Sequence, residues 1–305
     1  MNNVTKKLLG MVADLFDSPN GAYNIREDGQ CAAQHSTKHI TIESKKDKPG
    51  INIIIRSQAQ GETVYIPACV THSNVNDLVY NDFYVQKGAD VVIVAGCGVH
   101  TDGEEDAMHN GIHRFFVEEN ARVKYIEKHV GIGEGTGKRI INPQTHIELA
   151  DMAYMEMDTV QIKGVDSTKR TSTAVLQRGA TLVIKEKIMT HGSQFAETNF
   201  VVDLNGEDSG ANLISRSIAR DQSNQIFRSR INGNDKCHGH SECDAIIMDQ
   251  GTVSAIPELT ANHIEASLIH EAAIGKIAGE QIMKLMTLGL TEQEAEAKII
   301  EGFLK

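Results

Sequence analysis

Val85–Val91 reads VQKGADV, and the same pattern returns three times further along the chain, as VEENARV at 117–123, LADMAYM at 149–155 and LQRGATL at 176–182. In each copy an apolar residue precedes two polar or small residues, a small or medium-sized residue, an alanine, a residue of any kind and a second apolar residue. A weaker copy, DSGANLI, occupies 208–214. The alanines are Ala89, Ala121, Ala153, Ala180 and Ala211, at intervals of 32, 32, 27 and 31. The chain therefore carries an internal repeat of about 30 residues.

This repeat predicts an all-β core built as a solenoid. From about Thr41 to Ile277 the sequence consists of short strand-like pieces, such as INIIIRS, ADVVIVAG and ATLVIKEK, separated by Gly, Asn and Asp. A repeat of this length without helices between the strands is typical of coils that stack on one another. A β-sandwich would also produce frequent turns, but it gives no reason for a fixed period. We therefore favour the β-solenoid.

Helices are predicted at both ends of this core. Near the N-terminus, apolar residues recur at helical spacing before the turn sequence SPNG. They are Leu8, Met11, Val12, Leu15 and Phe16. Near the C-terminus, GEQIMKLMTLG and TEQEAEAKIIEGFLK predict a helical hairpin, with Thr291 and Glu294 at capping-box spacing. The chain is thus divided into an N-terminal helical segment (1–25), a β core (26–278) and a C-terminal helical segment (279–305). The hairpin can cover the open end of the solenoid, dock a partner, or do both.

The composition argues against several classes of function. A formal net charge of −11 over 305 residues does not fit a broad nucleic-acid surface, which needs clustered Lys and Arg. The N-terminus shows no export signal, and no apolar run reaches the roughly 18 residues that could span a membrane. Five cysteines without a small-domain disulfide pattern indicate a cytoplasmic protein in a reducing environment.

Lys236–Asp244 reads KCHGHSECD and concentrates two cysteines and two histidines. If coils of about 27 to 32 residues stack about 4.8 Å apart, Cys243 lies beneath His270 and Glu271 in the next coil. Thiolate, imidazole and carboxylate are ligands of first-row metals, and thiolate with imidazole suits zinc or an iron–sulfur cluster. In the alternative interpretation, Cys243 is a small buried apolar residue and His270 a core residue with satisfied hydrogen bonds. The matched spacing of the whole group favours a site.

Two further cysteines are weaker candidates. Cys237 lies close to Cys243, but their spacing is wider than the roughly two to four residues of a zinc knuckle, and no second pair follows. Cys97 in AGCGVH precedes His129 by one full repeat and is expected to stack against it. Taken alone, that pair is more typical of packing than of a site.

Other motifs do not support an enzyme. GIGEGTGKR at 131–139 lacks both the first Gly and the final Ser or Thr of a phosphate-binding loop, so we expect no ATP binding by this chain. Nucleophile-elbow, zinc-protease and dinucleotide motifs are also missing. VDSTKRTSTA, with Lys169 and Arg170, is predicted to be a solvated turn rather than an anion site. A carbohydrate-active β-helix enzyme would need a repeating column of carboxylates, which the sequence does not show.

The residues from Cys237 to the end carry a family resemblance. The run CDAIIMDQGTVSAIPELTANHIEASLIHEAAIGKIAGEQIMKLMTLGLTEQEAEAKIIEGF closely resembles the C-terminal part of the SufB/SufD family of iron–sulfur cluster assembly proteins. That family has a Cys-Asp strand, an IPEL stretch, a His-Glu-Ala strand and a helix of the form G-(L/I)-(T/S)-E-x-E-A in this order. The resemblance implies a right-handed parallel β-helix followed by a helical part.

The resemblance also implies a site and a partner. Cys243 stands where SufB-type members have the essential cysteine of the assembly site, and Glu271 stands where they have a candidate glutamate ligand. His270 matches the histidine that SufD-type members contribute. The helices from Gly279 to Phe303 correspond to the surface that docks SufC, an ABC-type ATPase. ATP would then be hydrolysed by this partner, and the chain itself would not be an enzyme.

We therefore expect a cytoplasmic scaffold on which a transient iron–sulfur cluster is assembled. Its ligands would be Cys243, Glu271 and His270, joined by Cys237 and Cys97. Because SufB-like and SufD-like residues occur in one chain, which lacks the long N-terminal region of typical members, a homodimer could replace the usual heterodimer. A sulfur donor and apo-protein acceptors complete the expected partners. The alternative is a SufD-like structural or regulatory subunit that holds the ATPase without carrying a cluster.

Overall fold

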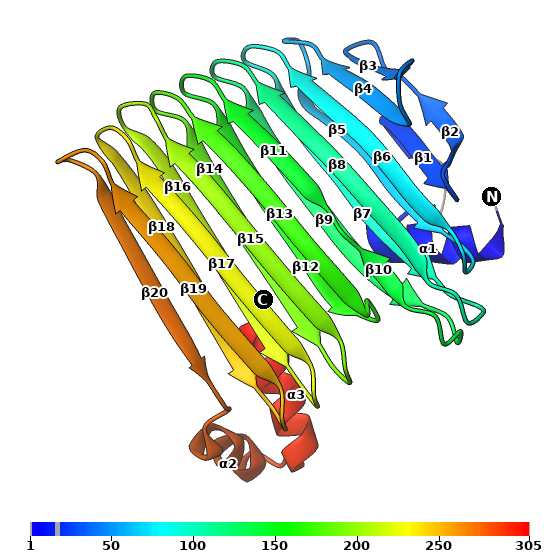
Figure 1. Ribbon diagram of the computed structural model, residues 1–305, viewed down its shortest axis with the longest axis vertical. Coiled ribbons are helices and arrows are strands. Elements are labelled where there is room, and N and C mark those ends of the chain that lie inside the picture. Colours follow the sequence, from blue (N-terminus) through cyan, green and yellow to red (C-terminus); the bar gives the residue numbers. More distant parts are fainter. Residues whose placement is uncertain (1, 16–18, 305) are drawn as a thin grey trace.

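Two ten-stranded β-sheets face each other and form a solenoid, described in a computed structural model for residues 2–15 and 19–304. The chain alternates between the two sheets, so that each coil contributes to both, and Figure 1 shows the coils stacked in chain order. The core is a β-solenoid of about eight turns with a short helix before it and two helices after it. This architecture confirms the fold class that the repeat predicted.

The strands of each sheet follow one another along the stack. The first sheet has the order β2 (Gln30–His35), β1 (Ala22–Glu27), β5 (Gln60–Val70), β7 (Asp90–His100), β9 (Arg122–Ile132), β12 (Tyr154–Lys163), β14 (Thr181–Thr190), β16 (Ser209–Ala219), β18 (Cys237–Ile247) and β20 (Ser267–Gly275). The second has the order β19 (Thr252–Ala261), β17 (Asn224–Gly233), β15 (Phe195–Leu204), β13 (Ser167–Leu176), β10 (Arg139–Ile141) with β11 (Gln144–Leu149), β8 (Ala107–Val117), β6 (Asn76–Val85), β4 (Gly50–Ile55) and β3 (Ile40–Ser44).

The first coils differ from the rest. Strands β1 and β2 pair antiparallel, as do β3 and β4, whereas the later coils pair in parallel. The sheets therefore begin at Ala22, earlier than the strand-like region that the sequence indicated from about Thr41. Strand β2 buries none of its residues, so it carries no periodic apolar signal that could have revealed it.

The alanine of the repeat forms one column where each coil enters the first sheet. The column runs through Ala59, Ala89, Ala121, Ala153, Ala180, Ser209 and Cys237. After Ala180 its next member is Ser209 and not the predicted Ala211, which pairs with Leu182. The weak copy at 208–214 is out of phase with the others, so the coil that starts at Ala180 is shorter than predicted. A methyl-sized side chain fits this column because its alanines are completely or almost completely buried.

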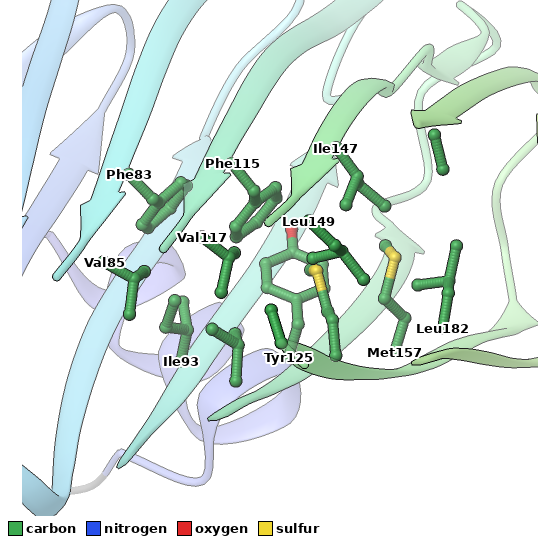
Figure 2. Packing of buried hydrophobic residues seen from close by; sticks show 14 of the residues in the cluster. Phe83, Val85, Ile93, Phe115, Val117, Tyr125, Ile147, Leu149, Met157 and Leu182 are labelled. Carbon is green, nitrogen blue, oxygen red and sulfur yellow. The ribbon is translucent and has the colours of Figure 1, made fainter. Parts of the chain in front are cut away.

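Apolar side chains stack between the sheets on one side of the interior. Phe83 and Phe115, from neighbouring coils, lie parallel with ring centroids 4.4 Å apart, and Tyr125 meets Phe115 edge-on at 5.2 Å. Figure 2 shows this ladder continuing through Ile147 and Leu149 toward Leu182. This stacking continues the apolar contacts from one coil to the next, and burial of their apolar surface stabilises each turn.

Helix α1 (Asn3–Ala13) packs on the outer face of the first sheet. Its apolar residues Leu8 and Val12 are fully buried, which confirms the amphipathic N-terminal helix; Phe16 lies outside the described residues. Two glycines of β7 allow this contact. A Cβ atom at Gly96 would lie 2.6 Å from Val12, and one at Gly98 would lie 2.7 Å from Leu8.

The C-terminal hairpin consists of α2 (Gly279–Thr287) and α3 (Glu292–Phe303). Thr291 and Glu294 form the predicted capping box, and Gly289, with φ of 95°, follows α2. Helix α2 lies beyond the end of β20 (Figure 1), whereas α3 runs back to β16, where Arg216 donates to the carbonyl of Phe303 over 3.4 Å. Both β19 and β20 stay exposed or only half-buried. The hairpin therefore leaves the end of the solenoid uncovered. No helix among the described residues is long and apolar enough to cross a bilayer.

The buried alanine column generates a stability prediction. Replacing Ala180, which is fully buried, by Leu forces three extra carbon atoms into a packed turn and should lower the free energy of unfolding by about 1 to 3 kcal/mol. Gln177→Leu, at an exposed position of the same turn, should change it by less than about 0.5 kcal/mol. Urea unfolding followed by circular dichroism measures both, and equal effects would contradict a packed column.

Candidate functional site

Strands β18 and β20 place the candidate ligands on neighbouring coils, but in a different register from the predicted one. Cys243 pairs with Ala272, the residue that follows Glu271. His270 pairs with Ser241, and Glu271 pairs with Glu242. Because successive side chains of a strand point to opposite faces, this register decides which residues share a face.

Cys243 and His270 share the inner face. Cys243 is fully buried, and Nδ1 of His270 is buried without a hydrogen-bond partner among the residues that the structure describes. Since His270 stands two residues before the partner of Cys243, their Cα atoms are about 8 Å apart diagonally across the two strands. A thiol and an unpaired imidazole nitrogen thus face the same end of the interior.

Glu271 points the other way. Its side chain is 67% exposed on the outer face, where it lies with His240 and Glu242. The predicted grouping of Cys243, His270 and Glu271 at one point is therefore wrong in its geometry. Glu271 stands one residue short of register with Cys243, and one residue is enough to turn a side chain to the opposite face.

Cys237 and Cys97 do not join this group. Cys237 is fully buried in the alanine column, between Ser209 and Ala266, and lies about 20 Å along β18 from Cys243. Cys97 lies five strands away in the same sheet, about 24 Å by strand spacing. It pairs in register with His129, as their separation by one repeat predicted. Neither cysteine can bind the same metal ion as Cys243 in this structure.

A row of buried polar side chains crosses the interior between Cys97 and Cys243. In order along the coils it contains Cys97, His129, Glu127, Arg170, Glu186, Ser215 and Cys243. Nη1 of Arg170 donates to Oε2 of Glu127 over 2.6 Å, and its Nε lies 3.4 Å from Oε1 of Glu186. The hydroxyl of Ser215, which pairs with Cys243, donates to Oε2 of Glu186 over 3.0 Å. The interior is therefore divided into an apolar side and a charged side.

Arg170 corrects the expectation that VDSTKRTSTA forms a solvated turn. From Ser167 onward the segment belongs to β13, whose residues alternate between buried and more exposed, and Arg170 is only 4% exposed. The alternation of Thr168, Arg170, Ser172 and Ala174 is the strand signal that the polar composition concealed. Its carboxylate partners come from other coils, so no local pattern could reveal the pairing.

The two carboxyl groups around Arg170 titrate differently. Burial alone would raise the pKa of both. At Glu127 the charges of Arg170 and His129 outweigh burial and hold the pKa well below its usual range. At Glu186 burial outweighs Arg170 and the hydroxyl donors Thr198 and Ser215, so the pKa is raised. Arg170 is thus neutralised mainly by Glu127, and Glu186 takes up a proton more readily.

Both thiols of the row are protonated at neutral pH. Burial raises the pKa of Cys243 to about 12, with further contributions from the charges of Glu186 and Asp244. Burial likewise raises the pKa of Cys97 well above its usual value, and the charge of Glu127 adds to the effect. Because thiolate is the form that binds metal or attacks sulfur, either reaction at Cys243 must first remove its proton.

Comparisons with known proteins connect this geometry to a family. Residues 73–303 match a family profile described as "SUF system FeS cluster assembly, SufBD core domain". An "Iron-sulfur cluster assembly SufBD family protein" of Archaeoglobus fulgidus is 30% identical over 85% of this chain and 70% of its own length. Proteins of the same description from Methanothermobacter thermautotrophicus (28% identical, 82% of this chain) and Pyrococcus horikoshii (32%, 66% of this chain) are each matched over 61% of their length.

The buried row predicts a large and specific effect of removing its cation. Arg170→Met removes the arginine that pairs with Glu127 and leaves this buried carboxylate with Tyr125 and His129 beside it, so the free energy of unfolding should fall by about 3 to 5 kcal/mol. Arg178→Met removes an exposed arginine that pairs with Asp151 over 2.8 Å and should cost less than about 1 kcal/mol. Denaturant unfolding measures both. Adding Glu127→Gln should recover part of the stability of Arg170→Met, and an equal loss in both single variants would contradict a buried ion pair.

Proposed function

The chain belongs to the SufBD family of iron–sulfur cluster assembly proteins, and from this premise we propose that it is a scaffold on which a transient cluster is built and then released. The observation that carries the proposal is the inner face of β18 and β20. There a buried thiol, Cys243, and a buried imidazole nitrogen without a partner, on His270, stand on neighbouring strands at the uncovered end of the solenoid. The cluster is cargo in this proposal and not a resident cofactor.

The ligand set of the proposed site is smaller than the sequence predicted. Cys243 and His270 supply the inward-facing ligands. Glu271 is near in sequence but faces outward, so it can join them only if the last strand rotates or if a second chain brings its own Glu271 into place. An imidazole is displaced more easily than a cysteine thiolate, which suits a cluster that must leave its scaffold.

A homodimer is part of the proposal. Strand β20 is the last of its sheet, and its outer edge and that of β19 are open to another chain. A two-fold axis at this end would bring two copies of Cys243 and His270 together and so provide enough ligands for one cluster. The five free cysteines fit a reducing cytoplasm, where a sulfur donor and apo-protein acceptors would complete the pathway.

The C-terminal hairpin is the proposed docking surface for a SufC-like ABC ATPase. Helix α2 has no buried residue and exposes Met283 and Met286, and Leu288 follows it with 79% exposure. Apolar side chains in such a group are typical of protein contacts. The glycine-rich segment at 133–138 connects β9 to β10 and not to a helix, unlike a phosphate-binding loop. We therefore propose that ATP is hydrolysed by the partner and that this chain is not itself an enzyme.

Cluster reconstitution tests the scaffold role. Anaerobic addition of Fe²⁺, sulfide and reductant should give a brown wild-type protein, and Cys243→Ser or Cys243→Ala should lose most of the iron and acid-labile sulfide. The alanine variant fits the packing, because the neighbouring position in register is Ala272. Cys31→Ser is the matched control, because Cys31 is an exposed thiol on β2, at the opposite end of the solenoid. Unchanged iron and sulfide in both Cys243 variants, with normal thermal unfolding, would remove Cys243 from the role.

A SufD-like subunit without a cluster is the second candidate. It is favoured by one observation, the complete burial of the Cys243 side chain, which closes the thiol off from iron and sulfide in solution. Under this alternative the wild-type protein stays colourless after anaerobic reconstitution, while it still binds the ATPase.

Charge placed on α2 tests the docking surface. Met283→Glu with Met286→Glu would bury two carboxylates in an apolar contact and should weaken binding to the SufC-like ATPase at least about tenfold in a titration calorimetry experiment. Met152→Glu places the same charge at a methionine that is 57% exposed on a distant turn and should leave the affinity unchanged. Equal affinity of the double variant and the wild type would exclude α2 from the interface.

A further inference from the structure

The outer face of β18 and β20 carries a second group of potential ligands. His240, Glu242 and Glu271 each offer one ligand atom, and these three atoms all lie within 4.8 Å of one another. Nε2 of His240 is 3.8 Å from Oε2 of Glu271. The group lies on the opposite side of the sheet from Cys243 and His270, so the two sets of side chains do not compete for one ion.

The charges of this group are not balanced by the protein. Glu242 and Glu271 pair directly in register on parallel strands, an arrangement in which like charges repel. Two other outward carboxylates have a cation beside them: Glu156 has Lys185 at 2.9 Å, and Glu258 has Arg230 at 2.6 Å. In the part of the chain that the structure describes, no lysine or arginine forms an ion pair with Glu242 or Glu271. A bound cation would convert the repulsion into attraction.

His240 is oriented for metal binding by a residue outside the group. Its Nδ1 lies 2.9 Å from Oδ1 of Asn212, on the neighbouring strand β16. When Nδ1 carries the proton and donates to this oxygen, the lone pair of Nε2 is directed toward the two glutamates. Metal-binding histidines are commonly held in this way by an acceptor on the other ring nitrogen.

We propose that His240, Glu242 and Glu271 form a binding site for a first-row divalent cation. One imidazole nitrogen and two carboxylates make a mixed ligand set that suits Fe²⁺, Mn²⁺, Co²⁺ or Zn²⁺, and they leave coordination positions open for water. The identification of the natural ion as Fe²⁺ rests on the proposed function; the existence of the site does not. Glu242 precedes Cys243 and Glu271 follows His270 in the sequence, so the site would hold iron next to the inward-facing ligands, with only the sheet between them.

Cobalt binding to the tag-free, chelator-treated full chain tests the site. Titration with Co²⁺ should give weak visible absorption without the intense sulfur-to-cobalt band that thiolate ligands produce. His240→Ala and Glu242→Gln should each weaken the binding at least about tenfold. Glu258→Gln, which changes an outward glutamate paired with Arg230, is the matched control and should bind like the wild type.

Thermal unfolding separates a lost ligand from a damaged fold. Without metal, Glu242→Gln should unfold at the same temperature as the wild type or higher, because the repulsion with Glu271 is removed. With Co²⁺ or anaerobic Fe²⁺, the wild type should be stabilised and Glu242→Gln should not. Equal Co²⁺ affinity in wild type and Glu242→Gln, or a metal-induced stabilisation that survives in this variant, would overturn the site.

Cys243→Ser distinguishes this proposal from the scaffold role. It should leave the Co²⁺ binding described here unchanged, whatever it does to cluster content. Loss of this binding in Cys243→Ser, together with a sulfur-to-cobalt band in the wild type, would assign the ion to the inner face and overturn the outer site. If Cys243→Ser keeps its cluster while Glu242→Gln loses Co²⁺, Cys243 is removed from the assembly site and the outer site stands. If the wild type stays colourless after reconstitution while Glu242→Gln loses Co²⁺, the scaffold role fails and the outer site stands.

Discussion

Parallel backbone hydrogen bonds between successive coils are the constraint on which the rest of this structure depends. They hold each residue of one coil opposite a single residue of the next, through register that is almost unbroken from β7 to β20. Because side chains alternate between the faces of a strand, the register also decides which of them meet inside the solenoid and which meet outside it. The alanine column and the inner and outer ligand groups are all consequences of it.

The interior that results is chemically divided. On one side Phe83, Phe115 and Tyr125 stack with aliphatic residues, so burial of apolar surface stabilises these coils. On the other side Arg170 lies between Glu127 and Glu186, and such a buried ion pair stabilises only when all its members are present. This charged region reaches Cys243 through Ser215, which gives the thiol a polar neighbour inside an otherwise closed core.

The last strand pair presents different chemistry on its two faces. Inside are a thiol and an imidazole, the softer ligands that suit iron–sulfur chemistry; outside are an imidazole and two carboxylates, which suit a hydrated divalent ion. Both groups lie where the stack ends and neither sheet has a further neighbour. This end of the molecule is therefore open to contacts that leave the coils before it undisturbed.

The solenoid, its terminal helices and the neighbourhood of residues 243 and 270 could be predicted from the sequence, because repeated apolar spacing and capping residues act locally. The face of the sheet on which each side chain lies could not be predicted in this way. Coil length varies along the stack, and an error of one residue sends Glu271 to the outer surface, away from Cys243. In the same way Cys237 proved to be a member of the alanine column, and Arg170 a buried cation. Their neighbours come from other coils, so only the hydrogen-bonded register of the folded chain decides what each side chain meets.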